Sequence, residues 1–356
     1  MEQTAVEKKF GKYVMASMIT MFLQSAYSMI DGLFVSNLIG DTALSAVNVA
    51  WPIIAVVTAI GTGVGCGGAV MMSTKQGEGK NEESNIVRAN VILALLASSI
   101  VVTILFLILL TPLLKLMGAE GELLRLSQIY GRVMLTGGVL QILSCGLTPL
   151  LRNDNRAVSA MMIMVGGLFA NLGLDFVFMY VFHMGIGGAA GASLCAQLFT
   201  TVCCLMILYT KKTDPIRLSQ FMIRKEYWKK IFKTAVSPFG ISLTPSLLIL
   251  YHNVACLKFG GDLAVNAYAL ISSTVGSYRV LLIGVAEGIQ PLASYAYGAH
   301  DFHAIRKIRN KAIITAIGVS FFLFIFTIAT ARFYPAIYGY EGEAAELGYH
   351  AVMVTA

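Results

Sequence analysis

Residues 28–52 read SMIDGLFVSNLIGDTALSAVNVAWP and hold one carboxylate, Asp31, inside an apolar run that ends at the pair Gly40-Asp41. A second apolar run begins before this stretch ends. A charged side chain at the centre of a membrane helix costs about 2.5–3.5 kcal/mol on insertion scales, so its presence needs a functional reason. The stretch therefore predicts two membrane-spanning helices, the first of which carries a functional acid.

The composition of the whole chain excludes an ordinary soluble domain. Of the 356 residues, 57% are hydrophobic and 13% are charged, and the mean hydropathy is +0.74, values typical of a polytopic membrane protein. Runs long enough to cross about 30 Å of hydrocarbon define nine predicted spans, at 14–38, 47–74, 89–113, 127–151, 157–183, 185–210, 231–257, 264–297 and 311–336. A tenth run begins near Leu347, so we expect the chain to stop where a helix starts.

The basic residues indicate the orientation in the membrane. Lysine and arginine gather in the N-terminal tail and in alternate connections, most densely at 211–233, whereas the connections near 39–46 and 184 contain none. Because lysine and arginine favour cytoplasmic loops, the N-terminus is predicted to be cytoplasmic. We interpret the basic segment 211–233 as a solvated cytoplasmic linker, and a lipid-binding patch is the alternative.

The chain also aligns with itself, without gaps, at an offset of 221 residues. The matches include Gly40-Asp41 with Gly261-Asp262, Gly63 with Gly284, Gly67 with Gly288, Ser73 with Ser294, Gly77 with Gly298, and Arg88 with Arg309. Chance similarity between glycine-rich membrane segments is the alternative explanation. Because the offset covers an even number of spans, the copies share their orientation and predict two six-helix lobes. The predicted parts are an N-lobe at 1–210, a cytoplasmic linker at 211–230, and a partial C-lobe at 231–356 with three spans and the start of a fourth.

Two acids of the predicted N-lobe lie at similar depth. At a rise of about 1.5 Å per residue, Asp31 and Asp175 are each about 17–18 residues from the cytoplasmic start of their span. Gln24 and Tyr27 share a helix face with Asp31, and Asn171 precedes Asp175 by one turn. Two carboxylates in one low-dielectric chamber cannot both stay ionised, so we predict that the pair takes up a proton or Na+.

Polar residues on other spans extend this prediction. Ser193 and Gln197 lie one turn apart in the sixth span, and Gln141 belongs to a polar stripe of the fourth. We expect Ser193 to add an oxygen ligand to the cation site, and we take Gln141, Gln197 and Tyr27 as candidates for substrate binding. Ordinary hydrogen bonds between helices are the alternative for such stripes.

The predicted C-lobe carries three further substrate candidates. Glu287 lies deep in the eighth span and is the best candidate for attracting a cationic substrate; Arg279 is too far for direct pairing, since eight residues of helix cover about 12 Å. His252 occupies the repeat position of Asp31 and is followed by Asn253. A hydrogen-bonded packing role is the alternative for this histidine.

Several motifs occur in the same order as in a known family: Ser28 to Val35, Gly40-Asp41, Ala50-Trp51-Pro52, Leu151-Arg152-Asn153-Asp154, Asn171 to Asp175, Gly185 to Ala190, Gly288-Ile289-Gln290-Pro291 and Tyr297-Gly298-Ala299. With these motifs the chain resembles the MATE (multidrug and toxic compound extrusion) family, most closely its bacterial DinF-like branch. The resemblance implies an all-α polytopic membrane protein with six plus six helices in two lobes around a central cleft, here with about nine full spans and a truncated C-terminal lobe. It also implies that Asp31, Asn171 and Asp175 form the coupling-cation site, with Gln24 and Ser193 close by.

The expected function is secondary active efflux of organic cationic or amphipathic small molecules, in antiport with H+ or Na+, by alternating access. We expect a monomer in the bacterial cytoplasmic membrane, with no cofactor beyond the coupling ion and no nucleic-acid partner. No HExxH, GxSxG or P-loop motif is present, so an enzyme is not expected. The alternatives are a flippase or exporter of a lipid-linked or anionic compound, and a non-transporting fragment.

Overall fold

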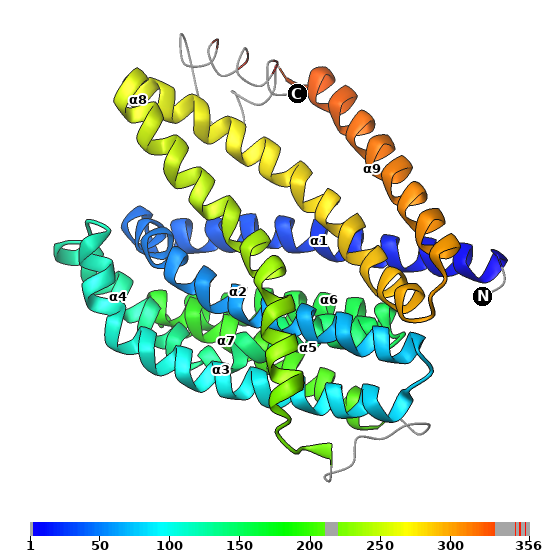
Figure 1. Cartoon of the computed structure of the whole chain (residues 1–356). Helices are drawn as coiled ribbons and strands as arrows, with labels where there is room; N and C mark the ends of the chain where they lie inside the picture. Colours follow the sequence, from blue (N-terminus) through cyan, green and yellow to red (C-terminus); the bar gives the residue numbers. More distant parts are fainter. Residues whose placement is uncertain (1–2, 211–219, 332–345, 347–348, 350–352, 354–356) are drawn as a thin grey trace. The chain divides into compact units, whose positions relative to one another are not determined.

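The computed structural model describes residues 3–210, 220–331, 346, 349 and 353, and these ranges contain helices and no strand (Figure 1). The predicted tenth span near Leu347 lies almost entirely outside the described residues. The helices are α1 (Gln3–Ile39), α2 (Asp41–Gly77), α3 (Asn81–Leu116), α4 (Gly121–Thr136), α5 (Gly138–Asn153), α6 (Ala157–Asp175), the π-helix η1 (Phe176–Val181), α7 (Gly185–Tyr209), α8 (Lys225–Gly298) and α9 (Phe302–Thr330).

Among the described residues, six helical segments are long and apolar enough to cross a membrane, on α1, α2, α3, α6 with η1, α7 and α9. The predicted fourth span is instead two helices, α4 and α5, which are bent by 57° and make a seventh span if they are counted as one. The chain is therefore an all-α integral membrane protein, as predicted. The count of nine spans stays a prediction, because the segments 231–257 and 264–297 both lie on α8. Figure 1 shows the α8 ribbon doubling back where its colour passes from green to yellow.

The described chain forms two compact units. Unit 1 comprises 1–25, 244–289 and 306–356, and unit 2 comprises 26–243 and 290–305. The main hydrophobic core lies in unit 2 and is built largely from α2, α3, α5 and α7. The predicted division into an N-lobe, a linker and a C-lobe stays a prediction.

Small residues bring α2 and α5 close together at the centre of unit 2. A Cβ atom added to Gly65 would lie 2.4 Å from the Cα of Gly146, and one added to Gly61 would lie 2.7 Å from the carbonyl oxygen of Ile142. Close approach at small residues is the usual way in which membrane helices associate, because lipid supplies no hydrophobic force between them. The glycines at these positions therefore set the spacing of the two helices.

The packing of the glycines follows the internal repeat. Two glycine contacts in one copy of the repeat have counterparts in the other copy. In each counterpart, both the glycine and the residue that it touches are shifted by 221 positions. The contacts are Gly63 with Phe239 and Gly67 with Ala235 in unit 2, and Gly284 with Met18 and Gly288 with Val14 in unit 1. Chance similarity does not explain equivalent partners in space, so the alignment at this offset reflects a structural repeat.

Candidate functional site

The acids of the predicted cation site are positioned by α1 and α6. Asp31 lies on α1 and is half-buried, whereas Asn171 and Asp175 lie one turn apart on α6 with exposed fractions of 5% and 0%. The Asn171 Nδ2 atom donates a hydrogen bond of 2.9 Å to Asp175 Oδ2. The i, i+4 spacing in the sequence therefore produces a direct contact that orients the buried carboxyl group.

The structure brings the two carboxyl groups together. The side chains of Asp31 and Asp175 lie close enough to interact with each other. Carboxylate oxygens only accept hydrogen bonds, so a hydrogen bond between these two groups would require a proton on one of them. The Asp31 Oδ1 atom is buried and has no hydrogen-bond partner in the described part of the chain. A pair of adjacent carboxyl groups with an unsatisfied oxygen can bind a proton or a small hard cation.

Tyr130 also belongs to this site, although the sequence analysis did not select it. It lies on α4, its exposed fraction is 5%, and it interacts electrostatically with both Asp31 and Asp175. Its hydroxyl group can donate to a carboxylate or accept from a protonated one. The signal for Tyr130 in the sequence is weak, because tyrosines without function are common near the ends of membrane helices.

The helix that carries Asp175 changes its geometry directly after this residue. α6 ends at Asp175, and the chain continues as the π-helix η1 from Phe176 to Val181. Phe176 stacks on Tyr180 within this segment, with ring centroids 5.0 Å apart. π-helical turns widen the backbone and occur frequently at functional sites. Asp175 therefore lies where the backbone departs from α geometry, a feature that hydropathy does not reveal.

Gln141 has a structural hydrogen bond in addition to its predicted role. Its Nε2 atom donates to the carbonyl oxygen of Met134, on the other side of the break between α4 and α5. The bend removes the helical donor of this carbonyl group, so the glutamine satisfies it. The Gln141 Oε1 atom is buried without a partner among the described residues and is the atom left for a ligand.

α7 carries the two other predicted polar residues of unit 2. Ser193 and Gln197 are both half-buried and lie one turn apart. The Gln197 Oε1 atom is buried and finds no hydrogen-bond partner within the described ranges. An acceptor of this kind is available to a donor group on a bound molecule.

The remaining candidates belong to unit 1 or lie outside the described side chains. Gln24, which is exposed, and Glu287, which is half-buried, belong to unit 1. The exposed His252 also belongs to unit 1; its Nδ1 atom lies 2.7 Å from the carbonyl oxygen of Leu248, and its ring stacks on Tyr268 with centroids 5.0 Å apart. The side chains of Tyr27 and Asn253 lie outside the described part of the structure.

Comparisons with known proteins agree with this architecture. The sequence profile of the MatE family matches residues 16–177 and 241–356. The chain is 24% identical over 335 residues to the multidrug export protein MepA of Staphylococcus aureus strain N315, covering 92% of this chain and 72% of that protein. It is 24% identical over 318 residues to MepA of Staphylococcus saprophyticus, covering 89% of this chain and 70% of that protein.

Solved structures share the fold. The chain superposes on MATE in complex with MaL6 with a TM-score of 0.90 and 25% identity, covering 98% of this chain and 77% of that one. It superposes equally well on a MOP superfamily transporter from Pyrococcus furiosus, with a TM-score of 0.90, 25% identity and the same coverage. That structure is described with the words "reverse polarity of binding pocket suggests different function".

Proposed function

The chain belongs to the MatE family of membrane transporters, and we propose that it exports organic cationic or amphipathic small molecules in antiport with H+ or Na+. The broader class, a multidrug efflux transporter and not an enzyme, follows from the family and from the similarity to the multidrug export protein MepA. The coupling ion and the cationic substrate are the finer parts of the proposal.

The single observation that carries the proposal is the contact between the Asp31 and Asp175 carboxyl groups. In this proposal the pair binds the coupling ion together with Asn171, which already bonds Asp175, and with Gln24 and Ser193 close by. Binding a proton or Na+ removes the excess negative charge from a low-dielectric interior. A change of this kind is able to bias a two-state arrangement of helices.

The proposed substrate site uses neutral polar groups and one acid. Glu287 supplies the attraction for a cation, and the unsatisfied oxygens of Gln141 and Gln197 accept hydrogen bonds from the substrate. We include Tyr27, His252 and Asn253 in this site from their positions in the sequence.

We further propose that the protein works as two lobes, 1–210 and 231–356, joined by the linker 211–230 and related by the repeat. Alternating access then arises from movement of one repeat against the other around a site between them. In this proposal the monomer lies in the bacterial cytoplasmic membrane with nine full spans and its N-terminus in the cytoplasm.

Dye transport in inside-out vesicles tests the proposal. A fluorescent organic cation is expected to accumulate when a proton or Na+ gradient is imposed, and Asp31→Asn is expected to abolish this uptake. Glu122→Gln is the matched control, because Glu122 is an exposed carboxylate that pairs with Arg125 outside the site. Absence of gradient-dependent uptake by folded protein with either ion would exclude cation-coupled drug export.

Export of an anionic or lipid-linked compound is the second candidate function. It is favoured by the exposed Arg279 on α8 and by the description of the Pyrococcus furiosus relative, whose binding pocket has reversed polarity. An anionic site would attract its substrate through such cations. Transport of an anionic dye that exceeds transport of a cationic dye of similar size would favour this function.

A further inference from the structure

The last turns of α2 and α8 touch each other, and the internal repeat relates the two sides of this contact to each other. A Cβ atom added to Gly77 would lie 2.1 Å from the carbonyl oxygen of Tyr295, and one added to Gly298 would lie 2.0 Å from that of Thr74. Gly77 and Gly298 are 221 residues apart, and so are Thr74 and Tyr295. Each helix end therefore touches the other with the same atoms, as in an isologous interface.

A reciprocal contact between equivalent residues lies on the pseudo-two-fold axis that relates the two copies. The other glycine contacts of the repeat occur in two separate copies, Gly67 with Ala235 and Gly288 with Val14, and so lie away from the axis. At Gly77 and Gly298 the two backbones are in van der Waals contact, and no side chain lies between them. Any path that followed the axis would meet these two backbones at this level.

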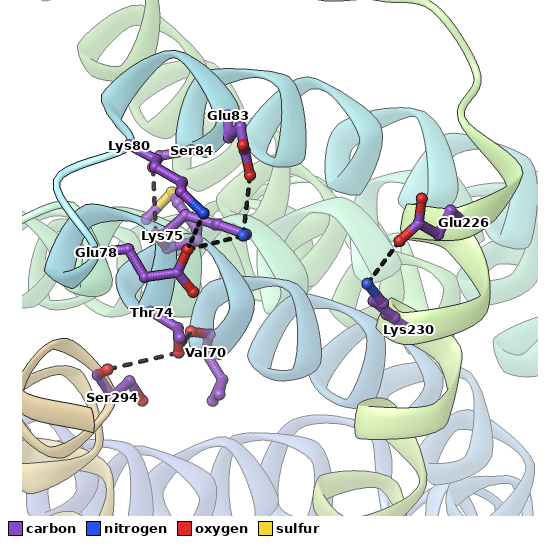
Figure 2. A network of polar contacts seen from close by, with 11 residues as sticks. Val70, Thr74, Lys75, Glu78, Lys80, Glu83, Ser84, Glu226, Lys230 and Ser294 are labelled. Atoms are coloured by element: carbon purple, nitrogen blue, oxygen red, sulfur yellow. Dashed lines mark hydrogen bonds and ion pairs between the residues drawn. The ribbon is translucent and has the colours of Figure 1, made fainter. Parts of the chain in front are cut away.

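Hydrogen bonds between the two repeats flank the contact. Thr74 Oγ1 lies 3.5 Å from the carbonyl oxygen of Ser294, as Figure 2 shows for the labelled pair. One turn deeper, Asn153 Nδ2 donates to Gln290 Oε1 at 3.1 Å, and Gln290 Nε2 lies 3.5 Å from the carbonyl oxygen of Cys66. These bonds are few and two of them are long, so they are weaker than the packing inside each repeat.

The part of this contact that belongs to the first repeat is held in place by further polar contacts within that repeat. Asn153 Oδ1 accepts a hydrogen bond of 2.9 Å from Ser73, and the adjacent Asp154 pairs with Arg88 at 3.5 Å. The side chains of Arg88 and Asp154 have exposed fractions of 0% and 1%. Breaking a buried ion pair leaves an uncompensated charge, so this turn keeps its shape when the contact across the repeats opens.

Charged residues mark the side of the membrane on which the contact lies. Lys75 pairs with Glu78 and Glu83 at 2.9 Å, and Lys80 pairs with Glu78 at 3.0 Å, where α2 ends and α3 begins (Figure 2). Hydrogen bonds from Lys75 and Lys80 hold the pKa of Glu78 below its ordinary value. The basic residues of this connection predict the cytoplasmic side.

We propose that Thr74, Gly77, Asn153, Gln290, Ser294 and Gly298 form a cytoplasmic latch, which closes the axial path in this structure and separates when the protein opens to the cytoplasm. The proposal rests on the transport function proposed above. Backbone packing at two glycines makes a tight seal, and the few hydrogen bonds across it are replaced by water once it opens at the membrane surface. The latch needs no hydrophobic side chains that would be exposed in the open state.

The native Cys66 reports on the latch without further substitution. It lies on α2, on the same helix face as Val70, Ser73 and Gly77, about 16 Å deeper than Gly77 at 1.5 Å per residue. A membrane-impermeant maleimide added to inside-out vesicles reaches Cys66 along the axis only when the latch is open. Mass spectrometry resolves the labelling at each site, and the other native cysteines serve as internal references.

The test compares Gly77→Ala and Gly298→Ala with the control Gly240→Ala, which lies on α8 with no atom within 4 Å of an added Cβ. An added methyl group prevents closure, so labelling of Cys66 is expected to rise about tenfold or more in each variant and to stay unchanged in the control. Because the contact is reciprocal, the two variants are expected to behave alike, and the double variant to label no faster than either one. Measurement without substrate or ion gradient keeps the result independent of the antiport proposal.

Unchanged labelling of Cys66 in both folded variants would overturn the latch, and so would a rise in only one of them. If the alanine variants do not fold, Gln290→Leu gives the second test, because it removes hydrogen bonds across the repeats without adding a clash between backbones. It is expected to raise the labelling of Cys66 by a smaller factor in the same direction. No rise with Gln290→Leu would exclude the proposal.

Discussion

Replacing Asp175 with asparagine removes a negative charge from the candidate cation site and keeps the shape of the side chain nearly unchanged. The residue is fully buried, and its carboxyl group contacts both Asn171 and Asp31. Two negative charges about 4 Å apart repel by about 4 kcal/mol at an effective dielectric constant of 20. The parent site therefore needs a proton or a cation, whereas the site in Asp175→Asn carries a single carboxylate and does not.

The measurement is thermal unfolding of the purified protein in detergent, over a series of Na+ concentrations at fixed pH and over a series of pH values without Na+. An ion at 100 times its dissociation constant stabilises the folded state by about 2.7 kcal/mol. We expect the parent to show a stabilisation of this order with one of the two ions. Asp175→Asn is expected to lose most of it while starting from an equal or higher midpoint in the absence of the ion, because the repulsion is already removed.

Glu122→Gln is again the control, since it removes an exposed carboxylate and is expected to keep the full response. A response in Asp175→Asn as large as that of the parent would refute the idea that the carboxyl pair binds the coupling ion. Equal loss of the response in the control would show that the effect is one of overall charge.

Two further predictions concern the scaffold. Gly65→Ala is expected to lower the free energy of unfolding by about 1–3 kcal/mol, because the added Cβ would lie 2.4 Å from Gly146 Cα. The control Gly173→Ala is expected to change it little, because no atom lies within 4 Å of the added Cβ. Thermal unfolding of both variants checks this prediction. Glu78→Gln is expected to lower stability by less than about 1 kcal/mol at neutral pH. Because Lys75 holds the pKa of Glu78 below its ordinary value, this contribution is present at neutral pH and is lost as the pH falls through the lowered value, so parent and variant are expected to unfold alike in strong acid.

Much of the fold was predictable because hydropathy acts locally along the chain. The apolar run predicted at 185–210 coincides with α7 within one residue, whereas α2, α3 and α9 begin six to nine residues before the runs predicted at 47–74, 89–113 and 311–336. The bend between α4 and α5 was not predicted, because Gly137 lies within one continuous apolar run and the bend is stabilised by a hydrogen bond from Gln141 to Met134. A glycine permits such a break, and the tertiary contacts decide whether it occurs.

The candidate site was predictable to the extent that it contains charge. Asp31 and Asp175 stand out in apolar runs, and equal depth suggested that they share one chamber. Tyr130 did not stand out, because a neutral aromatic residue near a helix end carries no penalty that marks it. The π-helix after Asp175 was equally hidden, since α and π turns have the same composition.

The sequence by itself determined that this protein is a helical membrane protein with intramembrane acids and an internal repeat, because insertion energy and self-similarity are properties of the linear chain. Tertiary structure alone decided which atoms meet: the two carboxyl groups, Tyr130 beside them, and Gly77 against Gly298 on the axis between the copies. These contacts depend on the rotation and spacing of helices whose contacting residues are between 45 and 221 positions apart. Small residues and buried polar pairs set that rotation and spacing, and their effect exists only when the helices are packed.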